Sequence, residues 1–158
     1  MKQIRTLIAS KRYSEALRAI EEERSSTTQP YLLVWKAICI QLEDSEETQY
    51  DLSDVEAALQ KALEIDEEYV EALLELGWFY YNVLDDARRA QPFFERLLKK
   101  CRDLTTEGLI GAARCIAERD SADDAIKFLD DTSQSLIDLE KLDEARRDLP
   151  SRSRDRNE

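Results

Sequence analysis

Apolar residues recur at intervals of three and four along almost the whole chain. This spacing places them on one face of an α-helix and so predicts an all-α protein. Because the connections between the predicted segments are short, neighbouring helices are expected to run antiparallel, as a row of helical hairpins. The predicted helices cover residues 2–10, 13–25, 30–43, 53–65, 68–84, 87–101, 106–119, 122–131 and 134–148.

Prolines and short polar residues mark the starts of several of these helices. Pro92 is an exception, because it falls about six residues into its helix, where it removes a backbone hydrogen bond. We expect it to bend that helix or to delay its start. The expected start signals are Pro30 in a first turn, Ser53 with Glu56 as a capping box, Asp85 or Asp86 as a cap, and Ser121 with Asp124.

Composition supports a helical fold and narrows the chemistry. The 158 residues include only 3 Gly and 3 Pro, and 37% are charged. His is absent, which removes the usual general base near neutral pH and the commonest metal ligand. The net charge of -12 argues against binding to nucleic acid or to an anionic membrane. Residues 31–70 hold most of this excess, so they are expected to attract a basic partner.

The three cysteines are typical of reduced residues in a cytoplasmic protein, because no signal-like or membrane-spanning apolar run accompanies them. Cys39 and Cys115 fall within apolar runs, so both are expected to be buried. Cys101 lies among basic residues and is expected to be more exposed.

Two segments have the polar composition of irregular structure. Residues 43–50 form an acidic polar stretch, and residues 150–158 form a polar tail that is expected to be flexible. The remaining length is that of one domain, predicted over residues 1–149.

A repeated pattern of apolar sizes runs through the predicted hairpins. The clearest copy spans residues 70–104, and it resembles the tetratricopeptide repeat, a helix-turn-helix of about 34 residues. Weaker copies extend the resemblance over about residues 1–132, as three to four degenerate repeats. The resemblance implies a right-handed solenoid of helical hairpins, with the last predicted helix as a capping helix. An irregular helical bundle is the alternative. The core positions of the clearest copy are Leu73, Leu76, Gly77 and Tyr80 on its first helix, and Ala90, Phe94 and Leu97 on its second. The copy before it places Trp35, Ile38, Cys39 and Leu42 at the corresponding core positions of its first helix.

Members of this family bind partner segments in a concave groove lined by first helices. The aromatic run Trp78 to Tyr81 is therefore expected to divide, with Tyr80 in the core, Phe79 against a neighbouring hairpin, and Trp78 and Tyr81 toward the groove. The alternative is that all four aromatics are packed core. The candidate partner-binding residues are Trp78, Tyr81, Leu74, Asn82, Glu71, Ile40, Lys36, Glu43, Ile110 and Arg114.

The sequence raises three hypotheses of function. The first is a non-enzymatic adaptor or chaperone that holds a protein or peptide with basic and apolar residues. The second is an acidic inhibitor, such as an immunity protein, that neutralises a basic toxin or enzyme through residues 43–47. The third, an enzyme, lacks support, because no nucleophile-base pair, phosphate loop or metal-ligand spacing is present in the sequence. No cofactor or metal is expected, and the oligomeric state stays open.

Overall fold

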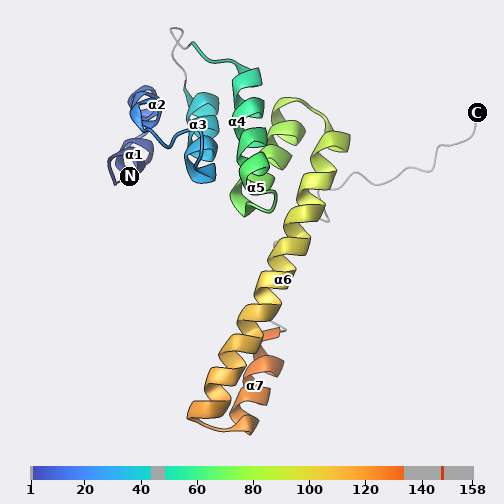
Figure 1. The fold of residues 1–158 in the computed structure, drawn as a ribbon. Coiled ribbons are helices and arrows are strands. Elements are labelled where there is room, and N and C mark those ends of the chain that lie inside the picture. The colour runs from blue at the N-terminus through green and yellow to red at the C-terminus, as the bar shows by residue number, and fades with distance from the viewer. Residues whose placement is uncertain (1, 44–48, 134–146, 148–158) are drawn as a thin grey trace, which may run out of the picture. The chain divides into compact units, whose positions relative to one another are not determined.

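The computed structural model describes residues 2–43, 49–133 and 147. These residues form helices joined by short connections, and no strand occurs among them, which confirms the all-α class (Figure 1). The tetratricopeptide-like solenoid stays a prediction. Its capping helix, predicted over 134–148, lies outside the described residues except for residue 147. The helices are α1 Lys2–Ala9, α2 Tyr13–Glu22, α3 Pro30–Leu42, α4 Leu52–Ile65, α5 Val70–Trp78, the π-helix η1 Phe79–Val83, α6 Ala87–Arg119 and α7 Ala122–Ser133.

The chain divides into two compact units, residues 1–104 and 105–158. In the first unit, α1 packs on α2, α2 on α3, α3 on α4, and α4 on α5, so successive helices lie side by side (Figure 1). Their apolar faces meet in one core, which supplies most of the stability of this unit. Its largest fully buried side chains are those of Tyr80, Phe79, Ile20, Leu32, Leu59, Leu73, Leu76, Val55 and Cys39.

The helix starts follow the predicted signals with one correction. Pro30 lies in the first turn of α3, and the Asp86 carboxylate caps α6 by accepting from the backbone N–H of Arg89 at 3.0 Å. The capping box of α4 is formed by Asp51 and Asp54, so the predicted pair of Ser53 and Glu56 is wrong. Extended backbone at Asp51 directs its carboxylate to the first N–H groups of the helix. At the start of α7, the Ser121 hydroxyl accepts from the N–H of Asp124 at 3.1 Å, as expected.

α6 corrects the predicted helix boundaries in the second half of the chain. One continuous helix replaces the two helices predicted over 87–101 and 106–119. Residues 102–105 contain neither Gly nor Pro, so nothing in this stretch breaks the backbone hydrogen bonds. The helix begins at Ala87 and contains Pro92, so the prediction that Pro92 delays the start of the helix is wrong.

The helix predicted over 68–84 changes its winding at the aromatic run. α5 ends at Trp78 and continues as the π-helix η1, in which the N–H of Leu84 donates to the carbonyl of Phe79 at 3.2 Å. The chain then turns through Asp85, whose φ of 51° is left-handed. A π-turn contains an extra residue, so it shifts the directions of the side chains that follow it. Phe79 and Tyr80 are both buried there.

The second unit contains the end of α6 and all of α7 among its described residues. Of those residues, only Ala113 and Ala125 are buried apolar side chains. Cys115 is exposed, so its predicted burial is wrong, whereas Cys39 is buried in the first unit as predicted. Within the described part of the chain, no helix combines the length and the apolar character needed to cross a membrane.

Candidate functional site

An exposed apolar surface lies where α5, η1 and α6 meet in the first unit. On α5 and η1, Leu74, Trp78 and Tyr81 are spaced by four and three residues and are turned outward, with Trp78 46% and Tyr81 51% exposed. On α6, Phe94 is partly buried and Leu98 is 68% exposed. We call these five residues the aromatic patch. Exposed aromatic and aliphatic groups that cluster in this way are typical of protein-binding surfaces.

Ring contacts hold the centre of the aromatic patch together. The Trp78 ring lies 5.0 Å from that of Phe94 and 6.0 Å from that of Tyr81, with interplanar angles of 70° and 72°. These are edge-to-face geometries, which aromatic pairs favour. A partner that binds to rings already held in place loses less side-chain entropy, so the patch is preorganised for contact.

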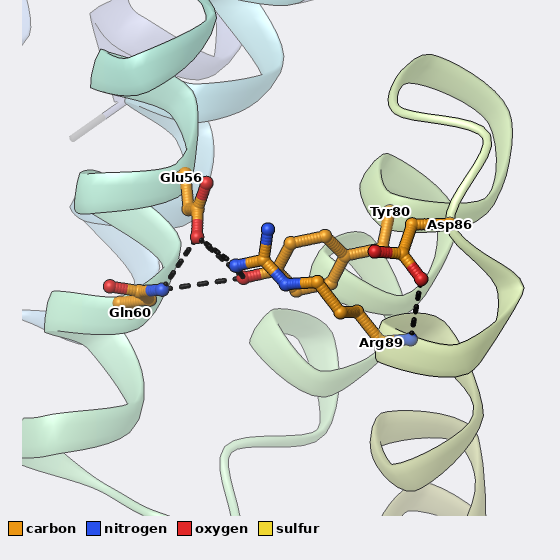
Figure 2. Close-up of polar contacts among 5 residues, drawn as sticks. All are labelled: Glu56, Gln60, Tyr80, Asp86 and Arg89. Carbon is orange, nitrogen blue, oxygen red and sulfur yellow. Dashed lines mark hydrogen bonds and ion pairs between the residues drawn. The ribbon is translucent and has the colours of Figure 1, made fainter.

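A polar network joins η1 to α4 and α6 (Figure 2). The Tyr80 hydroxyl donates to Glu56 Oε1 at 2.6 Å, and Arg89 Nη2 donates to the same oxygen at 2.6 Å. The Arg89 guanidinium also lies 4.1 Å from the Tyr80 ring centroid, and Gln60 donates to Glu56 at 2.9 Å. The hydrogen bond from Tyr80 lowers the pKa of Glu56, and Arg89 lowers it further. These groups satisfy one another, so the network is a structural tie.

Two contacts fix α6 to the turn between α4 and α5. Lys100 Nζ lies 2.6 Å from the carboxylate of Glu68, and Arg96 donates to the backbone carbonyl of Glu67. The ion pair is largely exposed, so we assign it little stability on its own. The two contacts and the Tyr80 network together hold the first part of α6, which carries Phe94, beside α4 and α5.

Two glutamates and an asparagine lie beside the aromatic patch on α5 and η1. Glu71 is exposed, and Glu75 is partly buried, with no hydrogen bond or ion pair from its carboxylate to any described residue. Burial raises the pKa of Glu75. The helical spacing places both carboxylates near Trp78, because residues three and seven positions apart share a helix face. Asn82 in η1 is exposed as well.

The structure corrects the predicted contribution of α3. Ile40 is buried at 9% exposure and packs in the core, so it does not line a binding surface. Lys36 and Glu43 contact other residues of the chain: Lys36 Nζ lies 3.7 Å from Glu21, and Glu43 accepts from Ser14 at 2.6 Å. Leu42, predicted as a core position, is 48% exposed. The buried face of α3 is thus rotated from the one that the repeat pattern implied.

The remaining candidates divide between the two units. Trp78, Tyr81, Leu74, Asn82 and Glu71 lie together on α5 and η1 in the first unit and are exposed. Their contact with a partner stays a prediction. Ile110 and Arg114 are exposed residues of α6 in the second unit, whereas the site described here belongs to the first unit.

Three residues of the site were not predicted from the sequence. The repeat pattern places Phe94 in the core alone and gives no role to Leu98 or Glu75. Leu98 follows Phe94 by four residues, so the spacing along α6 was a signal for it. Glu75 gave no signal, because its partial burial arises from packing.

No group of three or more His, Cys, Asp or Glu side chains among the described residues is placed to hold a metal ion. A hollow of about 490 Å³ on α1 and α2 is lined partly by Arg12, Glu15 and Arg18. Arg12 pairs with Glu15 there at 2.5 Å, and no nucleophile-base pair accompanies them.

Comparisons of the chain with protein-family models, with curated proteins and with solved structures find no match.

Proposed function

We propose that this protein is a non-enzymatic binding module, an adaptor or chaperone, that holds a segment of a partner protein on its aromatic patch. The observation that carries the proposal is the exposure of Trp78 and Tyr81 beside Phe94. Burial of apolar surface stabilises a protein or a complex by roughly 25 cal/mol for each Å² removed from water, and the exposed rings lack this stabilisation. A partner that covers the rings gains this free energy on binding.

The polar network around Tyr80 supports the proposal. Tyr80, Glu56 and Arg89 fix the helices that carry the rings, so the patch keeps its shape without a partner. Aromatic side chains with a polar edge are enriched among residues that dominate binding energy in protein interfaces. The net charge of -12 favours a partner with basic residues.

The test is the double variant Trp78→Ala/Tyr81→Ala. We expect it to keep the far-ultraviolet circular dichroism spectrum and cooperative melting of the native protein, because both side chains are about half exposed. We expect it to lose the partners that the native protein captures from its cell lysate. Leu52→Ala is the matched control, because Leu52 is 49% exposed on α4 and does not belong to the aromatic patch. Equal capture by the double variant and the native protein would contradict the proposal.

An acidic inhibitor of a basic toxin or enzyme is the alternative function. The same capture experiment distinguishes the two functions when it is carried out at low and at high salt. Binding to the acidic stretch 43–47 would weaken steeply as salt is raised, and it would survive the loss of Trp78 and Tyr81. Binding to the aromatic patch should fall with the double variant and respond less to salt, because it depends mainly on apolar contact.

A further inference from the structure

The carboxylates beside the aromatic patch restrict what can cover it. The carboxylates of Glu71 and Glu75 have no hydrogen bond or ion pair to the described residues. A partner that buries Trp78 removes water from the neighbouring Glu75, and a desolvated carboxylate is costly unless it gains a cation or hydrogen-bond donors. The occupant must therefore supply positive charge as well as an apolar group.

A second copy of the chain does not meet this requirement. Two copies that paired symmetrically through their aromatic patches would remove water from Glu71 and Glu75 of both copies at once, and the five residues of the patch include no Lys or Arg to pair with them. Each copy also carries a net charge of -12, so long-range repulsion opposes the encounter. A patch of five residues is small beside the roughly 20–30 residues that each side of a stable protein interface contributes. These observations favour a short segment of a different protein.

We propose that the segment bound by the aromatic patch carries a Lys or Arg next to its apolar anchor, and that Glu75, assisted by Glu71, receives this cation. This inference rests on the proposed function, because it names the partner chemistry of the same surface. The apolar anchor packs against Trp78, Phe94 and Leu98. The cation lies on the α5 side of the patch, where it pairs with Glu75.

The geometry of α5 gives the cation two interactions at once. Glu75 and Trp78 are three residues apart on the helix, so their Cβ atoms lie about 5–6 Å apart. A cation held by the Glu75 carboxylate is therefore within reach of the Trp78 ring, whose face attracts positive charge. Partial burial of Glu75 reduces screening by water and salt and so strengthens the pairing. Glu71, one turn earlier and exposed, steers the cation rather than burying it.

The test is selection from a displayed library of short random peptides on the immobilised native protein. The Trp78→Ala/Tyr81→Ala variant serves for counter-selection. We expect the enriched peptides to combine an apolar or aromatic residue with a neighbouring Lys or Arg. One such peptide and its analogue with Gln in place of the cation are then titrated against the native protein, using Trp fluorescence.

Glu75→Gln should weaken the selected peptide by about tenfold and should leave the analogue unaffected, because only the charge pair is removed. The matched control is Glu22→Gln on α2, which changes the net charge equally outside the patch and should alter affinity by less than about twofold. Glu75→Gln should fold normally, because it replaces a carboxylate that burial disfavours.

The outcomes separate this inference from the proposed function. If enriched peptides depend on Trp78 and Tyr81 but lack cations, or if Glu75→Gln binds them as well as the native protein does, the inference is wrong and the binding function stands. If no enrichment depends on Trp78 and Tyr81, the proposed function is wrong as well.

Discussion

Phe94 lies so close to Gly77 that a Cβ atom on residue 77 would be 2.8 Å from Cε1 of the Phe94 ring. This approach lets α5 and α6 pack with the Phe94 ring directly against the backbone of α5. The same ring contacts Trp78 at 5.0 Å. The packing of these two helices and the centre of the aromatic patch therefore depend on the absence of a side chain at Gly77.

Gly77→Ala is expected to be about 1–3 kcal/mol less favourable than alanine at an open helical glycine, because the added methyl group displaces the Phe94 ring. Urea denaturation measures the change. Gly108 and Gly111, also helical, have no atom within 4 Å of an added Cβ and are the matched controls. Alanine at either control position should stabilise the helix by about 0.5–1 kcal/mol. A stabilising Gly77→Ala substitution would contradict the close packing.

Tyr80→Phe is expected to cost about 1 kcal/mol of unfolding free energy, because it removes the hydrogen bond from the Tyr80 hydroxyl to Glu56. A double-mutant cycle with Glu56→Gln should give a coupling energy of about 0.5–3 kcal/mol, since the two groups share one network. Tyr81→Phe is a suitable control, because the Tyr81 hydroxyl belongs to an exposed side chain. Additive effects of the two substitutions in the network would contradict the tie between α4 and η1.

Glu56 should make the protein more sensitive to acid. Its pKa in the folded state is lowered by Tyr80 and Arg89, so its contribution is present above the ordinary Glu pKa and is lost as pH falls through the folded value. Thermal melting between about pH 7 and pH 3 should therefore show less loss of stability with acid for Glu56→Gln than for the native protein. Equal slopes for the two proteins would contradict this contribution.

Glu75 should act in the opposite direction. Burial raises its pKa in the folded state, so the folded protein binds the proton more tightly than the unfolded chain does. The resulting penalty is complete above the folded pKa and is relieved as pH falls toward the ordinary Glu value. Glu75→Gln should therefore melt at a higher temperature than the native protein at neutral pH, and the difference should shrink in acid. A lower melting temperature at neutral pH would indicate a stabilising partner for Glu75.

The cysteines should differ in reactivity. Burial raises the pKa of Cys39 to about 11, whereas Cys115 is exposed and Cys101 is partly exposed. A thiol reagent added to the native protein should modify Cys115 and Cys101 and spare Cys39 until the protein unfolds. Mass spectrometry of the digested protein identifies the modified sites. Early modification of Cys39 would show that the core around α3 opens readily.

Much of the helical content followed from the sequence, because a helix is specified largely by the spacing of apolar residues and by local caps. The first turn of α3 at Pro30 and the Asp86 cap were read from single residues. The capping box of α4 was misplaced by two residues, because Asp51 and Ser53 are both good capping residues and only backbone geometry selects between them.

The candidate site was predicted in part. The outward direction of Trp78 and Tyr81 followed from helical geometry once Leu73, Leu76 and Tyr80 were assigned to the core. Ile40 was misassigned, because the repeat pattern fixed its place by analogy with α5, whereas α3 packs against different neighbours. Phe94 joined the site only through its contact with Trp78, two residues that are far apart along the chain.

The sequence by itself determined that this protein is helical, acidic and rich in aromatic residues on one helix, because composition and periodicity are local properties. Only the tertiary structure decided which face of each helix is buried, where α5 changes to a π-helix, and that α6 runs on through residues 102–105. Those features depend on contacts between distant segments and on the balance of backbone hydrogen bonds along a helix. The spacing of apolar residues along the chain specifies neither the contacts nor that balance.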